Sequence, residues 1–91
     1  MSVTVRVPSQ LRTLTGGAGE LSVPAGTVRQ LISSVEADHP GIEARLLDEQ
    51  GGLRRFVNVF VAEEDVRYLD GLDTKVADGA TVSIVPAVAG G

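Results

Sequence analysis

Apolar and polar residues alternate along the first part of the chain. The alternation over residues 2–7 predicts a strand with one buried face. Pro8 ends this strand because proline has no backbone N–H to donate to a neighbouring strand. Residues 20–23 alternate in the same way, and the glycine-rich end of residues 9–19 leads into them. The two stretches therefore predict a β-hairpin.

A helix is predicted after Thr27. Thr27 and Gln30 have the spacing of a capping box, in which each side chain bonds to the other residue's backbone N–H. The next residues follow the i, i+3, i+4, i+7 spacing of one apolar helix face. Pro40 and Gly41 end the helix, and residues 42–47 are expected to add one turn. The predicted buried face consists of Val28, Leu31, Ile32 and Val35.

Residues 53–61 form the strongest predicted strand, because β-branched and aromatic residues dominate its second half. Its three valines share one face, whereas Phe56 and Phe60 share the other. Apolar residues on both faces predict a central strand.

The remainder predicts shorter elements. In chain order we expect a polar turn at residues 63–65, a short edge strand at 66–68, an irregular crossing at 70–77, a turn at 78–79 and a last strand at 81–85.

The predicted order is β-β-α-β-β-β, an α+β fold with one main helix crossing a mixed sheet. One helix covers only one sheet face, so the other face meets water or a partner. Phe60, Phe56 and Val85 are predicted to gather on that uncovered face, where an apolar cluster marks a partner-binding surface. The alternatives are that neighbouring side chains cover them or that the faces are reversed.

The composition of the chain argues against several classes of function. A chain of 91 residues forms one domain. Eight basic and twelve acidic residues give a net charge of −4, and three residues are aromatic, which argues against nucleic-acid binding. The absence of cysteine excludes thiolate catalysis and cysteine-ligated metals, and it favours a reducing cytoplasm. No apolar run is long enough to cross a membrane.

The last residues are the main candidate site. Gly90 and Gly91 have no Cβ, so they could thread a narrow channel together with Val88 and Ala89 and leave the terminal carboxylate unhindered. That carboxylate is a poor electrophile and needs activation, for instance by adenylation. The alternative is a frayed terminus without function. We therefore expect a domain over residues 1–86 and a flexible tail over 87–91.

Three other features favour structural interpretations. The Gly17-x-Gly19 stretch precedes a strand rather than a helix, which is the wrong context for a phosphate loop. His39 is the only histidine and lies near a helix C-terminus, without a visible nucleophile or metal ligand beside it. The acidic residues 63–65 are expected to form a solvated loop.

The Thr27 helix start, the Asp78-Gly79 turn and the Pro86–Gly91 end together resemble the ubiquitin-like sulfur carrier family. That family includes the small subunit of molybdopterin synthase and the thiamine-type sulfur carrier. The resemblance implies a ubiquitin-like β-grasp fold. Within the family, residues 55–61 and 65–67 are most similar to the actinobacterial carriers of thiocarboxylate-dependent cysteine synthesis.

The resemblance also implies a reaction cycle. An E1-like activating enzyme would adenylate the Gly91 carboxylate with ATP, and a sulfur source would convert it to a thiocarboxylate. A cysteine synthase that uses pyridoxal phosphate would consume the sulfur, and a zinc metalloprotease would release cysteine. The chain would then be a co-substrate that binds no cofactor, and a monomer when free.

Three alternatives stay open at this point. The tail could serve a molybdopterin synthase or the thiamine pathway. It could join the chain to lysines of other proteins, as a ubiquitin-like modifier. It could also be inert, in a plain interaction domain.

Overall fold

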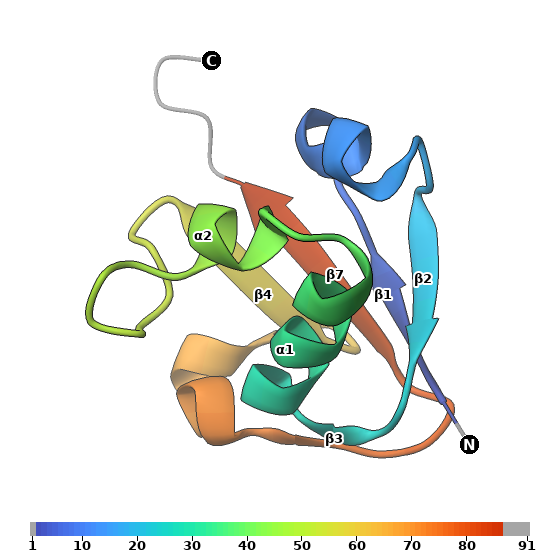
Figure 1. The fold of residues 1–91 in the computed structure, drawn as a ribbon. Helices are drawn as coiled ribbons and strands as arrows, with labels where there is room; N and C mark the ends of the chain where they lie inside the picture. Colours follow the sequence, from blue (N-terminus) through green and yellow to red (C-terminus); the bar gives the residue numbers. More distant parts are fainter. Residues whose placement is uncertain (1, 87–91) are drawn as a thin grey trace.

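A five-stranded mixed sheet forms the frame of the structure (Figure 1). The structure is a computed structural model that describes residues 2–86. Its strand order is β2-β1-β7-β4-β5, and β3 pairs with β6 in a separate two-stranded sheet. The strands are β1 (Val3–Arg6), β2 (Glu20–Val23), β3 (Gly26–Thr27), β4 (Val57–Val61), β5 (Glu64–Asp65), β6 (Lys75–Val76) and β7 (Thr81–Pro86).

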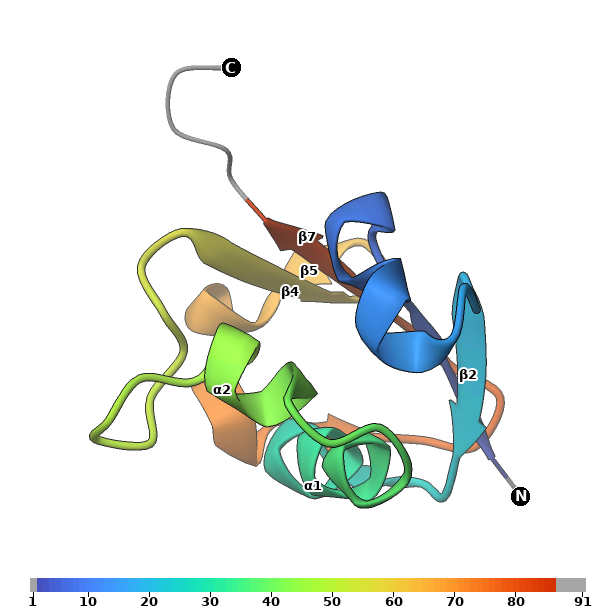
Figure 2. The same ribbon diagram turned by 45° about the horizontal axis from the view of Figure 1, so that its top comes forward.

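Two α-helices and three short 3-10 helices complete the fold. They are α1 (Val28–Asp38), α2 (Ile42–Leu46), η1 (Ser9–Thr15), η2 (Val66–Tyr68) and η3 (Gly71–Asp73). Figure 2 shows α1 and α2 on the same side of the sheet. This is the β-grasp arrangement, with α1 as the main crossing helix, and it confirms the predicted α+β fold class.

The first and last strands of the main sheet lie side by side. β1 runs parallel to β7, with Val5 opposite Val82, and antiparallel to β2. β4 runs antiparallel to β7, with Val59 opposite Ile84. β7 is therefore the middle strand and is paired on both edges. β4, the strand predicted to be central, is an interior strand as well, because β5 pairs with its other edge.

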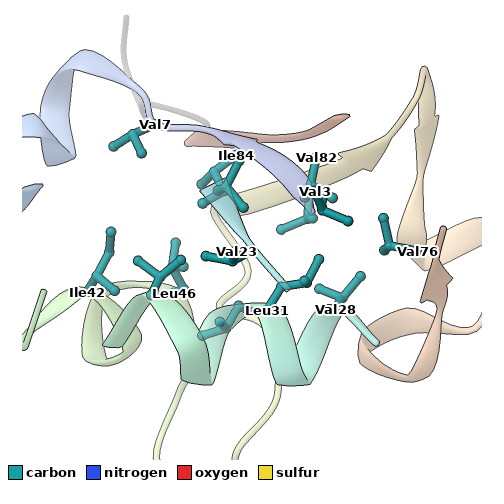
Figure 3. Close-up of a cluster of buried hydrophobic side chains, with 14 of the residues drawn as sticks. Val3, Val7, Val23, Val28, Leu31, Ile42, Leu46, Val76, Val82 and Ile84 are labelled. Carbon is teal, nitrogen blue, oxygen red and sulfur yellow. The ribbon is translucent and has the colours of Figure 1, made fainter. Parts of the chain in front are cut away.

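The core lies between the sheet and the helices (Figure 3). Alternate side chains of β1, β4 and β7 point into it, and the predicted apolar face of α1 packs against them. The other sheet face carries mainly polar side chains, so the predicted assignment of faces is correct. Ten of the core residues are labelled in Figure 3: Val3, Val7, Val23, Val28, Leu31, Ile42, Leu46, Val76, Val82 and Ile84.

Helix α1 begins and ends where the sequence predicts. The Thr27 hydroxyl accepts a hydrogen bond from the Gln30 N–H at 3.2 Å, and Gln30 Oε1 accepts one from the Thr27 N–H at 2.9 Å. At the other end His39 is the C-cap residue, and Gly41 adopts a φ of 107° that glycine tolerates best. The capping box is confirmed, and so is the predicted position of His39 near the helix C-terminus.

Two predicted elements are wrong. The strand expected from residue 53 begins only at Val57, because Leu53 pairs with Leu47 in an isolated bridge and residues 55–56 form a turn. Val66–Tyr68 is a 3-10 helix rather than an edge strand, because the Asp65 carboxylate caps it by accepting a hydrogen bond from the Arg67 N–H at 2.8 Å. The edge strand is instead β5, within the stretch predicted to be a polar turn.

Candidate functional site

Strand β7 leads directly to the predicted carrier site. Val82 and Ile84 are buried and fix the strand against the core, and Pro86, its last residue, is paired with Val57. The predicted site residues Gly91, Gly90, Ala89 and Val88 lie outside the described residues. A segment of five residues spans at most about 18 Å when fully extended. A reactive Gly91 would therefore act within about 18 Å of Pro86.

The three residues predicted to form one partner-binding surface lie in two places, with Phe60 and Val85 on the sheet face and Phe56 on a turn. Phe60 lies opposite Ser83, and Val85 lies opposite Asn58, so Phe60 and Val85 are diagonal neighbours on the face away from the helices. Phe60 is half-buried, and Val85 is 43% exposed. Phe56 is 55% exposed but belongs to the turn before β4.

Arg67 holds the turn that carries Phe56. Its guanidinium donates hydrogen bonds to the carbonyl oxygens of Arg54 and Val57, at 2.9 and 2.7 Å, and to Asn58 Oδ1 at 2.7 Å. The Arg54 side chain ties the same turn to α2 through the carbonyl of Ala44, at 3.0 Å. Phe56 is thus exposed on a turn that is hydrogen-bonded from two sides.

Two open hollows flank the end of β7. One has a volume of about 410 Å³ and lies towards β1 and η1, and the other, of about 400 Å³, lies towards α2 and includes Phe56. Pro86 lines both. Figure 1 shows the tip of β7 between α2 and η1, the blue helix near the chain start. The chain therefore leaves the described domain between two shallow, open hollows.

Arginine side chains surround this position. The two hollows are lined by five of the chain's eight basic residues and by only one of its twelve acidic residues, Asp48. All five are exposed. We call this set the arginine collar; it consists of Arg6, Arg12, Arg45, Arg54 and Arg55.

The sequence analysis missed the collar. Two features of the sequence could have indicated it: the chain has seven arginines but one lysine, and Arg54 and Arg55 are adjacent just before the strongest strand. Arg45 joins that pair only through the fold, because the bridge between Leu47 and Leu53 brings the two segments together.

The described residues contain no cluster of three or more histidine, cysteine, aspartate or glutamate side chains that could hold a metal ion. Within residues 2–86, every buried polar side-chain atom has a hydrogen-bond partner. Thr15, for example, bonds to the carbonyl oxygens of Arg12 and Ala18. No helix in the described part of the chain is long and apolar enough to cross a membrane.

Two relatives that match this chain over its full length are named as sulfur carrier proteins. The sulfur carrier protein CysO of Mycobacterium tuberculosis (strain H37Rv) is 50% identical over 93 residues that cover all of both chains. A putative sulfur carrier protein of Archaeoglobus fulgidus is 38% identical over the same full lengths. The crystal structure of the Amycolatopsis orientalis BexX/CysO complex contains a chain that is 50% identical, with a TM-score of 0.92 over 98% of this chain and 99% of that one.

A β-grasp domain whose middle strand leads to Gly90-Gly91 is typical of small ubiquitin-like carrier proteins. The profile of the ThiS family matches residues 5–91, and the relatives match along their whole length. The chain belongs to the ThiS family and is a sulfur carrier protein.

Proposed function

We propose that this chain carries sulfur as a thiocarboxylate at Gly91. The observation that supports this most is the 50% identity to CysO sulfur carriers over the full length, in a chain that ends in Gly90-Gly91. Residues 1–86 act as the docking domain. Residues 87–91 act as the tail, in which Val88, Ala89 and Gly90 thread the channel of a partner enzyme.

The chemistry takes two steps. A Gly91 carboxylate oxygen attacks the α-phosphorus of ATP on an E1-like enzyme, and pyrophosphate leaves. Sulfide, or a persulfide with a reductant, then attacks the acyl carbon; the C–O bond to AMP breaks, and the thiocarboxylate remains. The ATP belongs to the activating enzyme, so this chain supplies the reacting group as a co-substrate.

Cysteine synthesis is the proposed destination of the sulfur, on the basis of the two CysO relatives. A synthase that uses pyridoxal phosphate accepts the sulfur, and the product becomes joined to Gly91 through a peptide bond. A zinc metalloprotease hydrolyses that bond, which releases cysteine and restores the Gly91 carboxylate. We place this cycle in the cytoplasm.

Phe60, Val85 and Phe56 are the proposed contact residues for these partners. Phe60 and Val85 offer a small apolar area on a mainly polar sheet face. Phe56 lies beside Pro86, where the tail leaves the domain. Exposed aromatic residues of this kind are typical anchors at protein interfaces.

The test is intact mass spectrometry after incubation with ATP, sulfide and the activating enzyme of the same organism. We expect the mass to rise by the difference between one sulfur and one oxygen atom, and the matched variant that lacks only Gly91 to keep its mass. Addition of the cysteine synthase with phosphoserine should then yield a chain extended by one cysteine. An unchanged mass, with an enzyme that charges another carrier, would contradict the proposal.

Protein modification is the second candidate, because small archaeal modifier protein 3 of Haloferax volcanii is 42% identical over 71% of this chain. A modifier would form stable isopeptide bonds with lysines of other proteins. Adducts found in cell extracts, and lost with Gly91, would support this function over sulfur delivery.

A further inference from the structure

We propose that the arginine collar docks on an acidic rim around the channel of the activating enzyme. The inference rests on the proposed function, since it names the chemistry of the surface that receives the domain while Gly91 reacts. It concerns charged contacts at the base of the tail, in addition to the apolar contacts proposed for Phe60, Val85 and Phe56.

The charge distribution is the first argument. Five arginines and one carboxylate line the hollows on either side of Pro86, although the whole chain has a net charge of −4. The other three basic residues therefore share the rest of the molecule with eleven acidic ones. Such a local concentration of positive charge accelerates association with an acidic surface and opposes association with a basic one.

The second argument is that part of the collar is not used within the described domain. Three collar arginines are engaged within residues 2–86: Arg6 pairs with Glu20 at 3.8 Å, and Arg12 and Arg54 donate to the carbonyl oxygens of Val7 and Ala44, both at 3.0 Å. Among the same residues, Arg45 and Arg55 make no ion pair or side-chain hydrogen bond. Their guanidinium groups are therefore available to carboxylates of a partner, which they can bind through two parallel hydrogen bonds.

The third argument is reach. Gly91 lies at most about 18 Å along the chain from Pro86. An activating enzyme that encloses the carboxylate and ATP must therefore bring its outer surface against the collar. The collar would then face the rim of the channel, where carboxylates complement its charge.

The experiment compares two variants with the same change in net charge. The test variant is Arg45→Glu with Arg55→Glu, and the matched control is Arg29→Glu with Lys75→Glu, at the other end of the domain. Conversion of each chain to the thiocarboxylate is followed by intact mass at several carrier concentrations, with the activating enzyme, ATP and sulfide, at 50 and 500 mM salt.

We expect kcat/KM for the test variant to fall about tenfold or more at 50 mM salt, with kcat retained at saturating carrier. At 500 mM salt the deficit should shrink to about twofold, because salt screens exposed charges. The control should stay within about twofold of the wild type at both salt concentrations. Thermal unfolding of both variants and of the neutral single variant Arg55→Gln separates a docking defect from misfolding.

Equal losses of kcat/KM in the test and control variants would overturn the inference. A loss of kcat/KM that persists at 500 mM salt, or a change confined to a higher KM for ATP, would overturn it as well. Failure of the proposed function has a different result: the wild-type chain itself would not gain sulfur. If the wild-type chain gains sulfur and the test variant has the same kcat/KM, the docking role of the arginine collar is wrong and the proposed carrier function stands.

Discussion

Thr27 joins two parts of the fold in a single residue, because it ends β3 and is the N-cap of α1. Its backbone pairs with Lys75 of β6, while its hydroxyl and backbone N–H complete the capping box with Gln30. The position of α1 over the sheet thus depends on a few polar contacts at its first turn. The buried face of the helix supplies the rest.

Thr27→Ala removes the hydroxyl and leaves one N–H of the first turn unpaired. We expect the free energy of unfolding to fall by about 1 kcal/mol, which corresponds to a decrease in Tm of roughly 4–8 °C for a domain of this size. Thr27→Ser keeps the hydroxyl and should retain most of the stability. Thermal unfolding by circular dichroism measures both, and equal losses would show that the cap is not the cause.

At the scale of elements, β4 carries both a core residue and a proposed docking residue. Val59 is buried against the core, whereas its neighbour Phe60 faces away from the helices and is half-buried. Adjacent residues of one strand therefore serve different purposes.

Val59→Asp places a charge in the core and should lower the free energy of unfolding by more than about 4 kcal/mol, enough to unfold much of the population. Phe60→Lys should leave the fold intact, because Asp65 lies directly opposite and offers the new ammonium a partner. Urea denaturation tests the first variant. Binding to the activating enzyme tests the second, and a folded Phe60→Lys chain with unchanged affinity would remove Phe60 from the docking surface.

The sequence was sufficient for the elements that bury a periodic apolar face, namely β1, α1, the valine-rich half of β4, and β7. It predicted the wrong element where a hydrogen bond from a polar side chain determines the backbone conformation. Val66–Tyr68 has the composition of a strand, but the Asp65 cap turns it into a 3-10 helix. The site at Gly90-Gly91 stays a prediction from residue type, because it lies outside the described residues. The arginine collar could not, because segments far apart in the sequence form it.

At the scale of the whole molecule, the polarity of the uncovered sheet face favours a monomer in the absence of a partner. The uncovered sheet face is mainly polar, and only Phe60 and Val85 interrupt it with apolar side chains. A stable homodimer usually buries a larger and more apolar surface.

We therefore expect the free chain to sediment as a monomer of 9.5 kDa at protein concentrations up to about 100 µM, well above the Kd of most stable dimers. Analytical ultracentrifugation at low and high salt measures this. A dimer whose formation is prevented by Phe60→Lys would instead make the sheet face a self-association surface.

The position of Lys75 keeps its amine away from the end of β7, which disfavours acylation of this lysine by the chain's own activated C-terminus. An adenylated glycine acylates amines, so a nearby lysine would close the chain into a dead-end ring. The only lysine lies on β6, which Figure 1 shows beside β3, at the opposite end of the domain from the tip of β7. Around the tip the basic side chains are arginines, which stay protonated at neutral pH and do not attack acyl groups. The described residues around the tip thus place positive charge near the proposed reactive end without a lysine amine.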